Sequence, residues 1–234
     1  MVLSVTKKTS KIRSVLLNMQ SGIKNSVPKD RKMWAYPFRI FTRPFDSFSD
    51  MKYEAKGSVL IANFILFLYF LSSVAEYMYT GFLYNDNDTT KLNIFVQLFS
   101  SVVIVVLWAV ANWAVCTLMD GEGTFKEIWI ASCYSLTPMI LGELIYIPLS
   151  NILVYEEQVY LQLIHIVSIL LLCFFLFAGM LVTHQYTALK TVLSCLLTVA
   201  AVILIMFLFL LVFSVVQQMY GFIQTVSTEI LNRT

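Results

Sequence analysis

Five long apolar stretches, separated by short polar segments, run through the chain between residues 59 and 216. They are Val59 to Phe82, Ile94 to Leu118, Ile128 to Leu149, Val159 to Val182 and Val192 to Val216. Each can cross the hydrocarbon core of a bilayer, which needs roughly 20 apolar residues in a helix. None alternates apolar and polar residues as a barrel strand does, and a backbone in lipid must satisfy its own hydrogen bonds. The pattern therefore predicts an all-α polytopic membrane protein, a five-transmembrane-helix bundle.

Composition also points to lipid as the surroundings of most of the chain. Hydrophobic residues make up 59% of the 234 residues and charged residues only 13%, with a mean hydropathy of +0.77. A soluble domain could not cover that much apolar surface. All four cysteines fall in apolar stretches and lack the paired spacing of zinc or redox sites, so we interpret them as small buried hydrophobic residues and expect no metal or cofactor.

Basic residues are concentrated before the first apolar stretch. Residues 1–56 contain twelve of the sixteen lysines and arginines, and their apolar runs are too short for a cleaved secretory signal. Because basic loops stay in the cytoplasm, the N-terminus is predicted to be cytoplasmic and the C-terminus, after five crossings, outside. The chain then divides into a basic N-terminal region at 1–56 and a membrane domain at 57–234.

A short amphipathic helix is predicted just before the first span. It begins at Pro44, a favourable first helical residue, and Phe41, Phe45 and Phe48 recur at helical spacing. One interpretation is a helix in the inner membrane interface, where the basic region binds anionic inner-leaflet lipids. The other is a helix packed on the cytoplasmic ends of the spans, and the periodicity fits both.

The inner loop between the second and third spans is the most patterned polar segment. In DGEGTFKE, Thr124 and Glu127 have the spacing of a capping box, and Gly121 follows the second span as a C-cap glycine would. A glycine-rich loop can also cradle phosphate, with Thr124 and Lys126 as donors, but the P-loop spacing is absent. We therefore favour a tight inner turn.

Three ionisable residues lie within the predicted spans: Glu76, Glu143 and His165. Each lies roughly 9 Å inside the outer end of its span, at a rise of about 1.5 Å per residue. Because burying such groups is costly, they form a candidate polar cluster that binds a cation or relays protons, or else a structural clamp between helices. We expect Glu143 and His165 to face each other across the third and fourth spans.

Two other residues stand out inside the spans. Pro138 lies in the middle of the third span, where a missing N–H is expected to kink the helix. Asn112, next to Trp113 on the inner half of the second span, carries an amide that must find a hydrogen-bond partner in the membrane. We expect that partner on a neighbouring helix.

These features, in this order, resemble the Yip (Ypt-interacting protein) domain family in its bacterial branch. The residues that carry the resemblance are Pro44-Phe45 with Phe48, Asn112-Trp113, Asp120-Gly121-x-Gly123, Pro138, Ser150-Asn151, His184 with Tyr186, and Gln217-Gln218 leading to Phe222 and Glu229. The resemblance implies a five-helix bundle with a cytoplasmic N-terminus, in a bacterial cytoplasmic membrane. Eukaryotic members act in vesicle traffic through small GTPases, but their Asp-Leu-Tyr-Gly-Pro segment is missing here. Some bacterial relatives are encoded beside carbohydrate ABC importers, which implies an accessory role.

The expected function is therefore non-enzymatic. The sequence has no H-E-x-x-H or G-x-S-x-G motif, and His165 and His184 are predicted on opposite sides of the membrane, so no catalytic residue or metal ligand is assigned. The leading hypothesis is a membrane scaffold or accessory subunit that binds lipid and other membrane proteins or a second copy of itself, with no nucleic acid partner. The alternative is a transporter or channel component that moves a small solute or ion past Glu76, Glu143 and His165.

Overall fold

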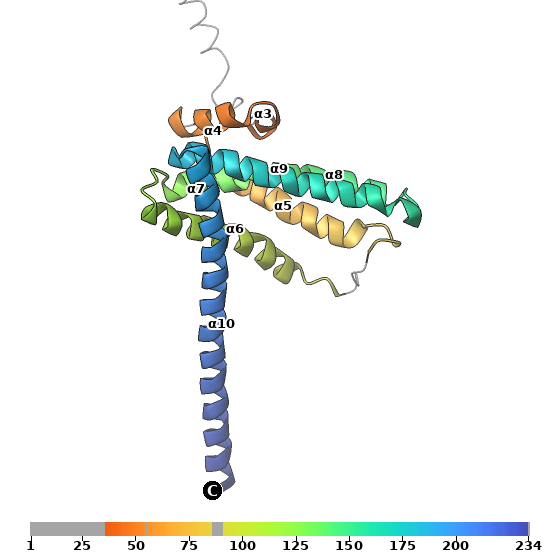
Figure 1. The fold of residues 1–234 in the computed structure, drawn as a ribbon. Coiled ribbons are helices and arrows are strands. Elements are labelled where there is room, and N and C mark those ends of the chain that lie inside the picture. The colour runs from red at the N-terminus through yellow and green to blue at the C-terminus, as the bar shows by residue number, and fades with distance from the viewer. Residues whose placement is uncertain (1–35, 55, 86–90, 234) are drawn as a thin grey trace, which may run out of the picture.

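A computed structural model describes residues 36–54, 56–85 and 91–233, and this part of the chain consists of helices joined by short loops, without strands (Figure 1). The helices are α3 (Tyr36–Thr42), α4 (Pro44–Tyr53), α5 (Val59–Tyr79), α6 (Ile94–Leu118), α7 (Phe125–Ser135), α8 (Thr137–Ser150), a 3-10 turn η2 (Tyr155–Glu157), α9 (Gln158–His184) and α10 (Ala188–Arg233). Five helical segments are long and apolar enough to cross a membrane. The predicted all-α, five-span fold is confirmed.

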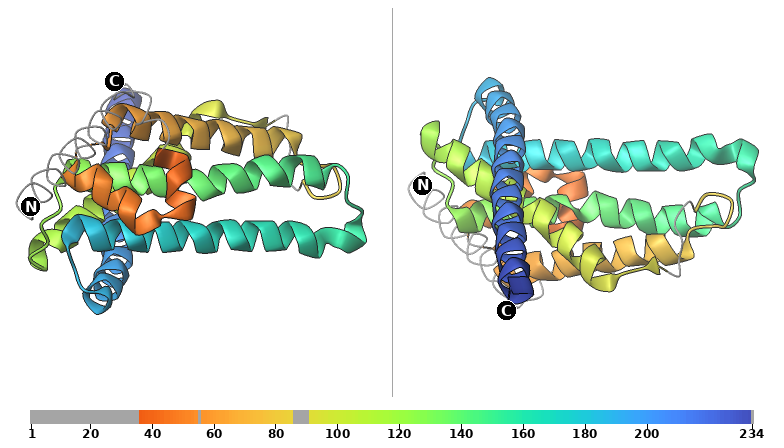
Figure 2. Two further views of the ribbon diagram at one scale, coloured as in Figure 1. Left: turned by 90° about the horizontal axis from the view of Figure 1, so that it is seen from above. Right: turned by 90° about the horizontal axis from the view of Figure 1, so that it is seen from below.

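Helices α5, α8 and α9 run alongside one another and form the body of the bundle (Figures 1 and 2). Helix α9 packs against α4, α7 and α8, and α5 packs against α6, α7 and α8. The core lies between α5, α7 and α9 and is almost entirely apolar; it includes Ile61, Ile65, Leu66, Ile128, Ala131, Tyr134, Phe175 and Met180. The buried face of each helix supplies this core, while the opposite faces carry exposed apolar side chains, as lipid-facing surfaces do.

The third span is broken into two helices, as Pro138 predicts. Helix α7 ends at Ser135, and α8 begins at Thr137 with Pro138 in its first turn. At the break the Leu136 N–H bonds to the Cys133 carbonyl, three residues back, at 3.2 Å. Proline has no N–H and its ring crowds the preceding turn, so the helical hydrogen-bond pattern is interrupted here. The two pieces together are 26 residues long.

Helix α10 joins the bundle only through its first turns. Three small polar residues of this part, Thr191, Ser194 and Thr198, are completely buried, and α10 packs mainly on α6. Beyond them the helix runs steeply away from α5, α8 and α9 (Figures 1 and 2). From Met206 to Val226 every side chain is exposed. The predicted fifth stretch is helical, and the helix continues past Val216 to Arg233, with exposed side chains as far as Val226.

The N-terminal helices α3 and α4 lie across α9. Phe48 is buried, while the rings of Phe41 and Phe45 meet Phe175 and Phe174 edge-on at centroid distances of 5.2 and 6.1 Å. Helix α4 begins at Pro44, as predicted. Phe41 and Phe45 keep 36% and 42% of their surface exposed, so they also remain available to the membrane interface.

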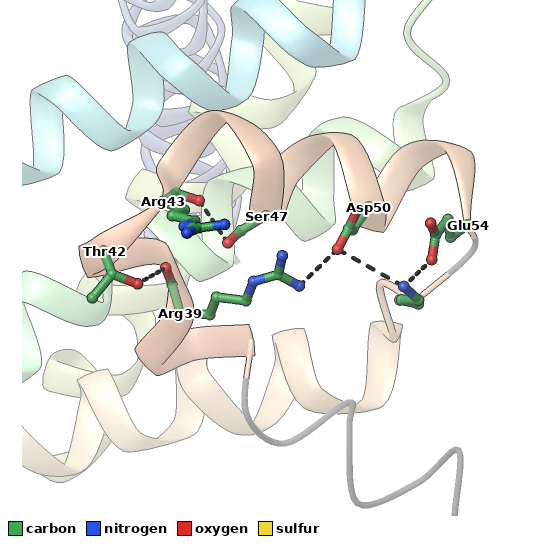
Figure 3. A network of polar contacts seen from close by, with 7 residues as sticks. Arg39, Thr42, Arg43, Ser47, Asp50 and Glu54 are labelled. Carbon is green, nitrogen blue, oxygen red and sulfur yellow. Dashed lines mark hydrogen bonds and ion pairs between the residues drawn. The ribbon is translucent and has the colours of Figure 1, made fainter. Parts of the chain in front are cut away.

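Ion pairs hold α3 and α4 in a fixed relation (Figure 3). The Arg39 guanidinium donates to the Asp50 carboxylate at 2.7 Å, and Lys56 pairs with both Asp50 and Glu54. Within the same turn Ser47 donates to the Arg43 carbonyl. Four of the twelve N-terminal basic residues, Arg39, Arg43, Lys52 and Lys56, belong to the described part of the chain, and those before residue 36 lie outside it.

Candidate functional site

A buried polar cluster joins three helices at the end of the bundle that carries α3 and α4. Asn112 of α6 is its centre: its side-chain oxygen lies 2.8 Å from His184 Nε2 of α9, and its amide nitrogen donates to Thr198 Oγ1 of α10 at 3.0 Å. All three side chains are at most 1% exposed. Since an amide oxygen only accepts, His184 must carry its proton on Nε2. The expectation that Asn112 finds a partner on a neighbouring helix is confirmed, since both His184 of α9 and Thr198 of α10 bond to it.

The loop between α6 and α7 packs its glycines directly against this cluster. A Cβ on Gly123 would lie 2.5 Å from His184 Nδ1, and one on Gly121 would lie 2.3 Å from the Tyr186 hydroxyl. At both positions a larger residue would force the neighbouring side chains to shift. The rings of His184 and Tyr186 stack at 5.2 Å, which extends the cluster to the surface of the loop.

The end of helix α6 corrects the predicted role of Gly121. The residue with positive φ is Asp120, at 53°, whereas Gly121 does not have positive φ. The Gly121 N–H bonds to the Cys116 carbonyl at 3.0 Å, which closes a Schellman turn with Asp120 as its left-handed residue. A small residue is favoured at position 121 because Tyr186 packs against it, and not because the backbone there adopts a positive φ.

The capping box at the start of α7 is present as predicted. Thr124 Oγ1 accepts from the Glu127 N–H at 3.4 Å, and Glu127 accepts from the Thr124 N–H at 2.9 Å. The Thr124 N–H and the hydroxyl oxygen thus both serve to start the helix, which explains this spacing without a phosphate.

Helix α4 is tied to the same cluster by Lys52. Its ammonium group donates to the Thr183 carbonyl at 2.7 Å, next to His184 and at the C-terminal end of α9. Carbonyls in the last turn of a helix lack intrahelical partners and favour a cation. The N-terminal region, α6, α9 and α10 therefore converge at one point.

Tyr186 forms the edge of this cluster and is buried. Burial of the phenol, together with the neighbouring Cys116 and Asp120, raises the pKa of Tyr186 to about 12. The hydroxyl stays protonated and points at the Met119 carbonyl, 3.4 Å away, while Lys190 lies over the ring at 4.5 Å. The Tyr186 side chain thus holds the loop between α9 and α10 against the C-terminal end of α6.

Two of the motif positions lie outside this cluster. Trp113 is half-exposed on α6, where its ring meets Phe125 edge-on at 6.3 Å. Pro138 lies farther along the third span, at the break between α7 and α8. Sequence reasoning missed Thr198 and Lys52. Thr191, Ser194 and Thr198 mark one face of an otherwise apolar helix, and that spacing was the available signal.

The predicted polar cluster occupies the opposite end of the bundle. Glu76 lines a cavity there, and Glu143 is buried with 6% of its surface exposed. Glu143 interacts electrostatically with Glu76 and lies within hydrogen-bonding reach of Ser72, but its Oε2 has no hydrogen-bond partner within the described residues. The two carboxyls are thus neighbours.

His165 lies apart from Glu143 in this arrangement. It is exposed, lines a second cavity, and interacts electrostatically with Glu76. In the described part of the chain no hydrogen bond or ion pair joins Glu143 with His165. The polar cluster is therefore centred on Glu76.

Comparison with known families identifies the chain. The Yip1 domain model matches residues 38–216, which is most of the sequence. The chain is a member of the Yip1 domain family. No curated protein and no solved structure matches it. The match includes α3 to α9 and the part of α10 that packs on α6, so the Asn112 cluster lies wholly inside the Yip1 domain.

The contact of Gly123 with His184 makes a testable prediction for this Yip1 domain. We expect Gly123→Ala to lower the free energy of unfolding by about 1–3 kcal/mol, the usual result of overpacking a rigid site. The matched control is Gly221→Ala, because an added Cβ there meets no atom within 4 Å. Thermal unfolding of both purified variants in detergent measures the difference, and equal midpoints would contradict the packing argument.

Proposed function

We propose that this Yip1 domain protein is a non-enzymatic membrane scaffold or accessory subunit, which holds partner membrane proteins along α10 and organises the inner leaflet through its basic N-terminal region. The proposed setting is a bacterial cytoplasmic membrane, with the N-terminus in the cytoplasm and the C-terminus outside. One candidate partner is a carbohydrate ABC importer; another is a second copy of the chain.

The geometry of α10 carries this proposal. At about 1.5 Å per residue, its 46 residues extend about 70 Å, more than twice the ~30 Å hydrocarbon core. The sequence from Val192 to Val216 has no charged residue, and from Val199 to Phe213 every residue is apolar, so this part of the helix is apolar on all sides. Such a helix is buried in lipid or against other transmembrane helices. Because α10 leaves the bundle steeply, its own chain does not obstruct a partner's approach (Figure 1).

The Asn112 cluster supports the same proposal because it anchors the start of α10. Its hydrogen bonds fix the first turns of α10 to α6 and α9, and Lys52 ties the N-terminal helices to the end of α9. A partner bound to α10 would therefore be held in a defined position relative to the membrane-facing N-terminal region. That is the mechanical requirement of a scaffold.

Site-specific photocrosslinking in cells tests the proposal. A crosslinking residue at Leu208 or Phe213, on the projecting part of α10, is expected to capture one defined partner, either a transporter subunit or a second copy. The matched control is Leu170 on α9, which is likewise an exposed apolar position, at 63%. Products with lipid alone from all three positions would overturn the proposal.

The alternative, a transporter or channel component, is supported by the neighbouring carboxyls Glu76 and Glu143. A transported ion would need to continue from there toward the other end of the bundle. The interior along that route is closed by large buried apolar side chains such as Ile65, Leu66 and Leu136. The arrangement favours a binding site that ends within the membrane.

A further inference from the structure

A polar cavity lies at the end of the bundle opposite α3 and α4. Its volume is about 240 Å³, and we call it the Glu76 pocket. Helix α5 and the turn after it form most of the wall, Gln97 of α6 forms one side, and Tyr146 of α8 forms the other. Under the predicted topology, the pocket faces the outer head groups.

Several hydrogen-bond donors around this pocket are used within the chain. Gln97 donates its amide N–H to Ser73 Oγ, Thr80 donates to the Glu76 carbonyl at 2.6 Å, and Asn85 donates to the Tyr77 carbonyl at 3.0 Å. Tyr84 donates to the Val154 carbonyl, and desolvation raises the pKa of its phenol, which keeps that proton in place. A ligand that needs donors, such as a phosphate, would find few here.

The carboxyl groups at this end of the bundle, in contrast, have oxygen atoms without a hydrogen-bond partner within the described part of the chain. The Glu76 carboxylate lines the pocket, and in the described part of the chain it makes neither a hydrogen bond nor an ion pair. Glu143 lies beneath it on α8, one turn before Tyr146, and its buried Oε2 also lacks a partner among the described residues. A carboxylate in the wall of a pocket at this depth favours a ligand that carries positive charge.

Aromatic rings complete the pocket. Tyr77, Tyr84 and Tyr146 line it, and Tyr84 and Tyr146 also line the adjoining cavity of about 370 Å³. The faces of aromatic rings attract organic cations, and a ring cage with a carboxylate is a known solution for binding ammonium groups. A bare metal ion fits less well, because the described residues contain no group of three or more His, Cys, Asp or Glu side chains that could hold one.

We propose that the Glu76 pocket binds an organic ammonium group. The group belongs either to a lipid head group of the outer leaflet or to a free solute, and Glu76 supplies the charge while the tyrosines supply the cage. The adjoining cavity accommodates the rest of the ligand. This site is independent of the scaffold proposed for α10, since it lies at the other end of α6 from the Asn112 cluster.

The test compares a cation with its neutral isostere on the full-length protein. The protein is placed in nanodiscs of phosphatidylglycerol at pH 8, and calorimetry measures the binding of two compounds. One is choline; the other is 3,3-dimethyl-1-butanol, which has the same shape without the charge. Native mass spectrometry of protein extracted from mixed membranes measures retained phosphatidylethanolamine against phosphatidylglycerol. Tighter binding of choline than of its neutral isostere indicates that the ligand is a free solute. Retention of phosphatidylethanolamine over phosphatidylglycerol indicates that it is a lipid head group.

Variants assign the binding to the pocket. Glu76→Gln is expected to weaken ammonium binding at least about tenfold, because the amide lacks the negative charge that attracts the cation. Glu76→Asp, which keeps the charge, should restore part of it, and Glu156→Gln, in the exposed turn η2, should leave it unchanged. The proposal is overturned if Glu76→Gln binds as the wild type does. It is also overturned if choline and its isostere bind equally and no phosphatidylethanolamine is retained, a result that needs no variant to fold.

Discussion

Replacing Phe48 by alanine is expected to release helix α4 from the bundle. The Phe48 ring is 97% buried and packs over Gly179 of α9, where an added Cβ would lie 3.3 Å from its edge. Removing a buried phenylalanine ring leaves a cavity that typically costs about 3 kcal/mol or more. The Lys52 contact with the end of α9 should be lost with it, since the same helix carries both residues.

Limited trypsin digestion of the protein in nanodiscs measures this release, because cleavage after Lys52, which lies within α4 and contacts α9, requires α4 to leave α9. Phe48→Ala should be cut many times faster than the wild type. The matched control is Phe38→Ala in α3, whose ring is 69% exposed, and its cleavage rate should not change. Wild-type resistance in Phe48→Ala would mean that the membrane interface, and not α9, holds the helix.

The spans could be predicted from sequence because hydropathy is a local property. Each predicted stretch became a helix, and the break at Pro138 followed from the chemistry of one residue. The direction of α10 could not be predicted in this way. An apolar helix looks the same in sequence whether lipid, its own bundle or another protein covers it, so only the contact with α6 decides where it goes.

For the candidate sites, too, the sequence predicted single residues but not the contacts between helices. The sequence identified Asn112 as a residue that needs a partner, and it named His184 and Gly123 through their order in the chain. It did not pair them, because they come from α9 and the loop after α6 and meet only in the folded bundle. Thr198 was overlooked because a single hydroxyl barely changes the hydropathy of a long span.

The pairing of Glu143 with His165 illustrates what depth alone can predict. Counting residues from the ends of the spans places both side chains at one height in the membrane, but it leaves their direction around the helix undetermined. In the structure Glu143 faces α5 and is buried, whereas His165 is exposed beside Gln162. Glu76 is the residue that interacts electrostatically with both.

Replacing Asn112 by alanine is the sharpest test of the cluster that fixes α10. The change leaves the His184 Nε2–H buried without an acceptor and removes the hydrogen bond to Thr198. A buried donor that loses its partner costs about 1–3 kcal/mol, and the lost contact with α10 adds to this. Thr198 still donates to the Ser194 carbonyl at 2.7 Å, so most of the cost falls on His184.

The expected result is an α10 that no longer keeps one direction relative to the bundle. Spin labels at Tyr79 on α5 and Gln218 on α10, both exposed, report that direction as a distance distribution. In Asn112→Ala the distribution should broaden and the unfolding midpoint should fall. Asn63→Ala is the matched control, because the Asn63 amide accepts from Trp129 at an exposed position and does not touch α10. An unchanged distribution in Asn112→Ala would show that apolar packing on α6 alone directs the helix, and the polar cluster would then have no part in positioning a partner.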